Sequence, residues 1–184
     1  MKKTLLMILL LLMFVITAAH ADTAAFNFRN GITWGMTSAD ISGIEGRECD
    51  IEYSFDNEHF IQFYENTSVS KYAADMQFVF WDDLLRLAAY DFHGTADDGS
   101  FTYLVNAMDS TYGASAEADA AKICDVLNHV VPDLYLPNEL TECRVWELAD
   151  TSIYMFCYPE NSFAIVYTDG AYFESITGFN VDGL

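Results

Sequence analysis

Basic residues and prolines are scarce in this chain. Its 8 Lys and Arg stand against 28 Asp and Glu, for a formal net charge of −20, and there are only 3 prolines. Nucleic acids and anionic membrane surfaces both attract clustered cations. The charge balance therefore excludes nucleic acid and anionic lipid as expected partners. It indicates an acidic surface that keeps the protein dissolved and monomeric.

Motifs for catalysis and for metal binding are missing too. No C-x-x-C is present, and the spacing of His59, His93 and His129 does not suit a set of metal ligands. An S-x-x-K runs from Ser68 to Lys71, but the companion motifs of penicillin-recognising enzymes are absent, and the segment lies between predicted strands. The sequence therefore predicts no catalytic residue, no metal site and no cofactor.

Residues 1–21 have the three parts of a secretory signal peptide. Two lysines precede an apolar run over residues 5–16, and Ala19 and Ala21 flank the predicted cleavage point. The run is shorter than the roughly 20 apolar residues that a membrane-spanning helix needs. We therefore expect residues 22–184 to form one domain outside the cytoplasm, secreted or periplasmic, without membrane insertion. Cleavage leaves 6 basic residues against 28 acidic ones, so the mature net charge is −22.

Four cysteines follow the predicted signal. An even number in an exported chain favours disulfides over free thiols. If the turn near the end of the chain is centred on Asp150, Cys143 lies directly opposite Cys157, close enough to be joined. We predict this pair, which leaves Cys49 with Cys124. A slip of one residue in the register would break the first pairing.

The order of the apolar patterns predicts strands, then helices, then strands. Thr37 and Asp40 form a capping pattern for a short helix that ends at Gly46. Strands are expected at residues 51–55, 60–64, 76–81, 84–93, 142–148, 153–158 and 163–168, helices at 38–45, 100–112 and 120–130, and a loosely held tail at 169–184. This order is typical of a single α+β domain, an antiparallel sheet of about five to seven strands packed with two or three helices.

Asp82 and Asp83 predict a two-residue hairpin turn. The register that follows pairs apolar residues on one face, namely Phe80 with Leu85, Phe78 with Leu87 and Met76 with Ala89. The other face is mixed. Trp81 lies on that mixed face beside the turn, which makes it the candidate for an exposed contact with a partner.

The segment Ile-Thr-Trp-Gly-Met-Thr-Ser-Ala-Asp-Ile at residues 32–41 resembles the W-G-M-[ST]-x-x-E-V opening of small uncharacterised exported bacterial proteins. The later order is similar as well, with a hairpin at residues 80–84, a helix end at Gly113 and Trp146 before a closing hairpin. More distantly, the opening resembles small outer-membrane assembly lipoproteins (SmpA/OmlA) and β-lactamase inhibitor proteins, although this chain lacks the lipid-bearing cysteine. The resemblance implies a helix-and-antiparallel-sheet binding fold and carries over no catalytic residue.

Two functions are compatible with these patterns. The first is an exported, non-enzymatic binding or interaction protein with a protein partner. The alternative is a small secreted hydrolase whose active-site residues lie scattered in the sequence. A deep pocket with a histidine and a carboxylate within hydrogen-bond reach would favour the hydrolase. A shallow surface with exposed aromatic side chains would favour the binding protein.

Overall fold

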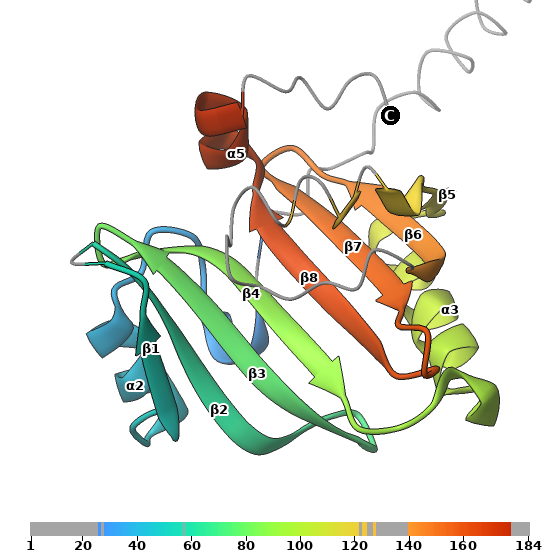
Figure 1. The fold of residues 1–184 in the computed structure, drawn as a ribbon, viewed down its shortest axis with the longest axis horizontal. Coiled ribbons are helices and arrows are strands. Elements are labelled where there is room, and N and C mark those ends of the chain that lie inside the picture. Colours follow the sequence, from blue (N-terminus) through green and yellow to red (C-terminus); the bar gives the residue numbers. More distant parts are fainter. Residues whose placement is uncertain are drawn as a thin grey trace, which may run out of the picture.

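The computed structural model describes most of the chain that follows the predicted signal peptide (Figure 1). The described residues are 26, 28–56, 58–121, 123, 124, 127 and 140–177. The predicted signal at residues 1–21 and the end of the predicted helix at 120–130 lie outside them. Among the described residues, no helix is long and apolar enough to cross a membrane.

The sheet has eight strands, and three helices are bounded by the structure. The strands are β1 (Ile51–Ser54), β2 (His59–Val69), β3 (Tyr72–Trp81), β4 (Leu84–Phe92), β5 (Ala116–Glu117), β6 (Thr141–Glu147), β7 (Thr151–Cys157) and β8 (Phe163–Asp169). The helices are α2 (Ser38–Glu45), α3 (Ser100–Tyr112) and α5 (Gly170–Thr177), and residues 120, 121, 123, 124 and 127 are helical too.

All strand pairs are antiparallel, in the order β1-β2-β3-β4-β8-β7-β6-β5. The α+β class is confirmed, whereas the predicted count of five to seven strands is too low. The strand missing from the prediction is β5, because two residues are too short to show an alternating pattern. The predicted tail is also corrected, since α5 continues directly from β8.

Helix α2 forms where its capping pattern predicts it. Thr37 Oγ1 accepts a hydrogen bond from the backbone N–H of Asp40 at 3.2 Å, and Asp40 Oδ2 accepts one from the N–H of Thr37 at 3.0 Å. This reciprocal pair satisfies two donors that the first helical turn leaves open. The helix ends at Gly46, whose φ of 67° is left-handed.

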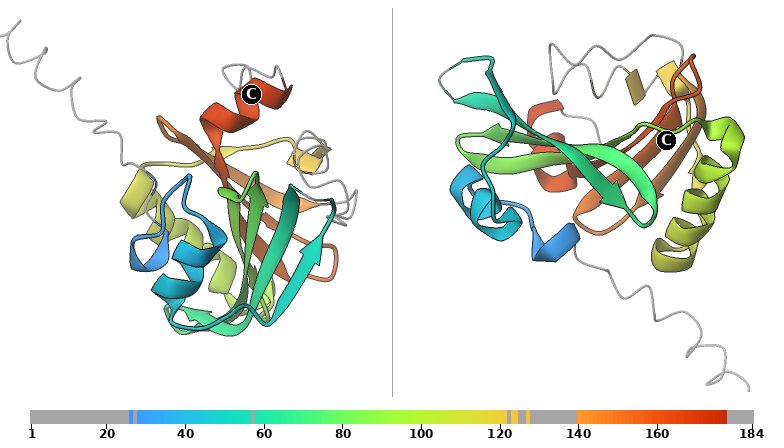
Figure 2. Two further views of the ribbon diagram at one scale, coloured as in Figure 1. Left: turned by 90° about the vertical axis from the view of Figure 1, so that its left-hand side faces the viewer. Right: turned by 90° about the horizontal axis from the view of Figure 1, so that it is seen from below.

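Apolar side chains pack on both faces of the sheet. The first face carries Phe78 of β3 and Tyr90 of β4, and α2 and α3 cover it from the same side (Figure 2). The second face carries Ile61 of β2 and Val166 of β8, and it packs against the helical residue Leu127 and α5. Successive side chains of each strand therefore point alternately to the first face and to the second face.

The turn at Asp82 and Asp83 is confirmed, and both residues have the positive φ of a tight hairpin. Phe80 lies opposite Leu85 as expected. Beyond this pair the predicted register is wrong by one residue, since Phe78 lies opposite Ala88 and Met76 opposite Tyr90. A β-bulge at Arg86 causes the shift. The bulge turns Leu87 and Ala89 to the second face, where they join its core.

Candidate functional site

The described histidines pair with carboxylates near strand ends. His59 Nδ1 lies 2.7 Å from Asp56 Oδ2, and His93 Nε2 lies 2.9 Å from Asp75 Oδ2. Asp75 also accepts the N–H of Asn66, at a bulge of β2. Among the described residues, no three His, Cys, Asp or Glu side chains converge to hold a metal ion. His129 lies outside the described residues.

The four cysteines are divided between the two faces of the sheet, two on each. Thr141, and not Cys143, lies opposite Cys157. The pairing expected from Asp150 is shifted by one residue next to the turn, and a bulge between Thr141 and Arg144 adds a second residue at Cys157. Cys143 consequently packs in the core of the second face, and Cys157 in that of the first. The other predicted pair, Cys49 with Cys124, is also split between the faces. Cys49 packs against the core of the first face, and Cys124 lies in the core of the second.

Burial keeps these thiols protonated. It raises the pKa of Cys143 to about 11 and that of Cys157 to about 12. Burial also raises the pKa of Cys49, and the charges of Glu52 and Glu48 raise it further. A thiol with a raised pKa is a poor nucleophile. Cys49, Cys143 and Cys157 therefore offer no activated thiol.

Trp81 lies half-buried between neighbouring rings. The ring of His59 is 4.6 Å from it, and the ring of Tyr172 in α5 packs edge-on at 5.0 Å. Tyr172 is held in turn by Arg86, whose guanidinium lies 4.4 Å from the tyrosine ring and whose Nη1 bonds Asp169 at 2.7 Å. The bulge that the sequence does not predict thus brings Arg86 to α5. Trp81 is packed as part of this cluster and does not project alone.

The most exposed large apolar side chains of the sheet lie on β1. Ile51 is 51% exposed and Tyr53 is 52% exposed, opposite Phe63 and Ile61 on the second face. Within the described part of the chain, β1 pairs with β2 on one side and with no strand on the other. Two half-exposed apolar side chains thus stand at an open sheet edge.

The backbone of β1 presents polar groups at this edge. The N–H of Phe55 donates to the carbonyl of His59 at 2.9 Å, in register with the β1–β2 pairing. Because peptide groups alternate sides along an antiparallel strand, those of Tyr53 also face β2, and those of Glu52 and Ser54 face outward. Their N–H and C=O groups form a template for a further strand.

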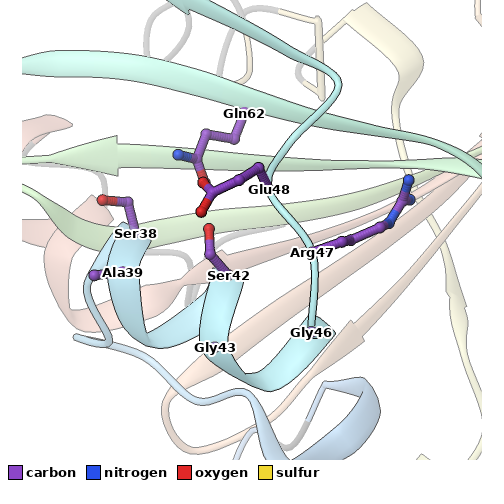
Figure 3. A pocket seen from close by; sticks show the side chains of 8 residues that line it. All are labelled: Ser38, Ala39, Ser42, Gly43, Gly46, Arg47, Glu48 and Gln62. Carbon is purple, nitrogen blue, oxygen red and sulfur yellow. The ribbon is translucent and has the colours of Figure 1, made fainter.

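A hollow of about 720 Å³ lies on the first face of the sheet, between α2, the segment that leads from α2 toward β1, and Gln62 of β2 (Figure 3). One wall of the hollow is formed by α2 and its C-cap. The residues there have small side chains or none, so they leave the space open: Ser38, Ala39, Ser42, Gly43 and Gly46. Arg47, Glu48 and Gln62 complete the lining. Figure 3 shows the Glu48 carboxylate directed into the hollow, toward Gln62 and Ser42, while Arg47 extends away from it.

A chain of hydrogen bonds links α2 to β1 across this hollow. Ser42 Oγ lies 3.1 Å from Tyr64 OH, and Tyr64 OH donates to Gln62 Oε1 at 3.4 Å. Gln62 Nε2 donates to Glu52 Oε2 on β1 at 3.0 Å. Gln62 is only 6% exposed, so its amide is held in place by these partners. The edge strand and the wall of the hollow are therefore positioned together.

The negative charge of the hollow is only partly neutralised. Arg47 Nη1 bonds Asp50 at 2.8 Å, and its Nη2 bonds the carbonyl of Glu65 at 2.9 Å. The cation is thereby committed to Asp50. Among the described residues, the ion pairs leave Glu48 and Glu52 without a cation. Glu52 lies on the first face of β1, and Glu48 points into the hollow on the same face.

We find no match to this chain among protein-family models, curated proteins or solved structures. The resemblance of residues 32–41 to small exported bacterial proteins therefore stays a prediction. What can be said of the site rests on its geometry alone.

The sequence alone did not identify this edge. Ile51, Tyr53 and Phe55 alternate with polar residues, which predicts the strand correctly, but the expected half-burial is wrong because all four residues of β1 are exposed. Alternation does not tell whether another element covers the apolar side. The small residues at helical spacing in α2 are the signal that could have located the hollow.

Proposed function

We propose that the mature chain is an exported, non-enzymatic binding protein that receives a segment of a partner protein along β1. The observation that carries this proposal is the open edge of β1, with Ile51 and Tyr53 half exposed on the second face of the sheet and the hollow on the first. In strand addition, main-chain hydrogen bonds supply affinity, and pockets for alternate side chains supply specificity. The open edge of β1 offers the main-chain hydrogen bonds, and the hollow offers a pocket for side chains.

The chemistry of the hollow favours binding over hydrolysis. No histidine lines it, and its two serines have other partners. Ser38 Oγ donates to Asp83 Oδ1 at 2.7 Å, and Ser42 Oγ bonds Tyr64 OH. A serine nucleophile needs a base within hydrogen-bond reach. A small secreted hydrolase is the alternative that the experiment below also tests.

The compartment of this binding protein follows from the predicted signal peptide. We place residues 22–184 in an extracytoplasmic space, secreted or periplasmic, with a partner from that space. The mature net charge of −22 favours a monomer in solution, since like charges repel. No nucleic acid, cofactor or membrane insertion enters this proposal.

Two proline substitutions at outward-facing positions test the role of the edge. Ser54→Pro removes an N–H from the open side of β1 and leaves the β1–β2 bonds intact. Glu117→Pro is the matched control on β5, because the N–H of Ala118 donates to Cys143 and so turns that of Glu117 outward. Matching circular dichroism spectra and melting temperatures would show that both variants fold.

The mature protein and both variants are then used as bait in the extracytoplasmic fraction of the native source. We expect a protein retained by the wild type and by Glu117→Pro, and lost with Ser54→Pro. A partner retained equally by all three proteins would contradict the assignment of the edge. Turnover of chromogenic ester, peptide or glycoside substrates with no partner recovered would establish the hydrolase instead.

A further inference from the structure

We infer that the segment received by β1 is an extended strand in which basic and apolar side chains alternate, an inference that rests on the proposed function. Successive side chains of a strand point to opposite faces of the sheet. A strand added beside β1 therefore directs every second side chain toward the hollow. The side chains between them lie over the second face.

On the first face, the added strand meets negative charge. Its side chains there lie beside Glu52 of β1 and above the hollow that holds Glu48. The half-buried thiol of Cys49 is affected by the same negative charge. Burial raises its pKa, and the carboxylates of Glu52, Glu48 and Asp50 raise it further. A cationic group is the one that these carboxylates stabilise.

The shape of the hollow suits a long side chain. The wall formed by α2 has no side chain larger than that of serine, so an aliphatic stem can lie along it. Lys and Arg bury such a stem while the charged end remains near water or an anion. Glu48 is directed into the hollow at a place where it can receive that end (Figure 3).

On the second face, the same strand meets apolar surface. Ile51 and Tyr53 lie on this side of β1, and Tyr53 packs edge-on against Phe55 with ring centroids 5.3 Å apart. Cross-strand pairs of aromatic and β-branched side chains stabilise a sheet. Val, Ile or an aromatic residue is therefore expected at each position that alternates with the basic ones.

Charge also argues against a second copy of this chain as the occupant. Pairing of β1 with β1 of another molecule would bring Glu48 and Glu52 of both copies together. The whole chain carries 28 acidic and 8 basic residues, so the repulsion is not compensated elsewhere. A cationic segment from another protein removes this repulsion and gains attraction.

The probe for this inference is a fluorescein-labelled Lys-Val-Lys-Tyr-Lys-Val peptide, titrated with the mature protein and followed by anisotropy. We expect saturable binding that weakens with salt, and about fivefold weaker binding for Glu48→Gln and for Glu52→Gln. Ser54→Pro should weaken binding about tenfold, whereas Glu117→Pro should not change it. A backbone N-methylated form of the peptide should fail to bind, which tests the edge without any protein variant.

Two control peptides separate alternation from charge alone. A block peptide, Lys-Lys-Lys-Val-Tyr-Val, has the same composition, and Glu-Val-Glu-Tyr-Glu-Val keeps the alternation with opposite charge. Equal binding of the block peptide, equal binding of the acidic peptide, or full binding by Ser54→Pro would each overturn the inference. A dimer that Ser54→Pro abolishes in sedimentation would also overturn it, because the occupant would be a second copy.

Failure of this inference is distinguishable from failure of the proposed function. If none of the peptides binds while the native partner is still lost with Ser54→Pro, the edge is a binding site and the chemistry of its segment is wrong. If the native partner is retained by Ser54→Pro, the proposed function itself fails at this edge.

Discussion

The two edges of the sheet are built in opposite ways. β1 has four residues, all exposed, with two large apolar side chains and a hollow beside it. β5 has only two residues, Ala116 and Glu117, and the glutamate is paired with Arg144 Nη1 on β6 at 3.1 Å. Short edge strands and charged side chains are the usual means by which proteins prevent pairing with another chain.

This difference indicates that an open edge is not a general consequence of the fold. At one edge of the sheet, β5 is short and carries an ion pair. At the other edge, β1 exposes apolar side chains to water. Exposed apolar surface of this kind marks interaction sites in soluble proteins. Each prediction below therefore compares a change at β1 with a change near β5.

The largest effect is expected near β5, where a disulfide can form. Cys124 and Cys143 share the core of the second face, and Cys124 adds to the effect of burial in raising the pKa of Cys143. If the chain is exported as proposed, we predict a Cys124–Cys143 disulfide, in place of Cys143–Cys157 and Cys49–Cys124. Closing this loop should stabilise the fold by about 3 kcal/mol.

Peptide mapping without reduction tests this pairing, and urea unfolding with and without reductant measures its effect. Cys49, beside β1, should be labelled by a thiol reagent in the native protein because it is only partly buried. A disulfide between Cys143 and Cys157 in the map would restore the original prediction. The β1 edge should bind its peptide equally before and after reduction.

The cysteine prediction shows where sequence reasoning reaches its limit. The existence of the seven longer strands and the start and end of α2 follow from alternation and capping, which are local properties, although β2 and β3 extend well beyond the predicted residues 60–64 and 76–81. The register of β6 against β7 is set by a turn closed by the bond from Leu148 N–H to the carbonyl of Thr151, and it shifts again at a bulge near Glu142, whose φ is 47°. A bulge is set by packing on both sides of the sheet, and no local pattern announces it.

The candidate site was beyond the sequence for a similar reason. Trp81 was predicted to be an exposed contact because it is an aromatic residue beside a turn. In the structure it packs against Tyr172 of α5, which the bulge at Arg86 holds in place. Ile51 and Tyr53 were expected to be half-buried. Their exposure depends on which strand lies at the edge, and strand order is a long-range property that composition and periodicity do not encode.

The next largest effect is expected from Gln62, which links β1 to the hollow. Gln62→Ala removes the donor to Glu52 and the acceptor of Tyr64 OH, and should cost about 2 kcal/mol in urea unfolding. In a double-mutant cycle, Gln62→Ala and Glu52→Ala should couple by about 0.5–1 kcal/mol. The same cycle with Glu117→Ala should show no coupling. Coupling to Glu117 would mean that the two edges are not independent.

Replacing the apolar side chains of β1 should separate binding from stability. Ile51→Thr with Tyr53→Thr keeps strand-compatible residues and should change the free energy of unfolding by less than about 0.5 kcal/mol, because both positions are half exposed. Binding of the Lys-Val-Lys-Tyr-Lys-Val peptide should nevertheless fall about tenfold. Ala116→Thr on β5 should change neither quantity. A large loss of stability in the double variant would mean that these side chains serve the fold.

The smallest effect is expected from acid, and it acts at both ends of the sheet. Hydrogen bonds from Thr37 lower the pKa of Asp40 in α2, and those from Ser115 and Trp146 lower the pKa of Asp109 near β5. A carboxyl with a lowered pKa stabilises the fold above its unfolded pKa, and this contribution is lost as the pH falls through the folded value. Melting temperatures of the wild type, Asp40→Ala and Asp109→Ala should therefore differ at neutral pH and converge as the pH falls below the ordinary pKa of an aspartate and through the lowered folded value. At neutral pH, Asp40→Ala should also weaken peptide binding, because it loosens the helix that walls the hollow, whereas Asp109→Ala should leave binding unchanged. Equal weakening by both substitutions would show that the β1 edge depends on the whole sheet, and the contrast between the two edges would then be lost.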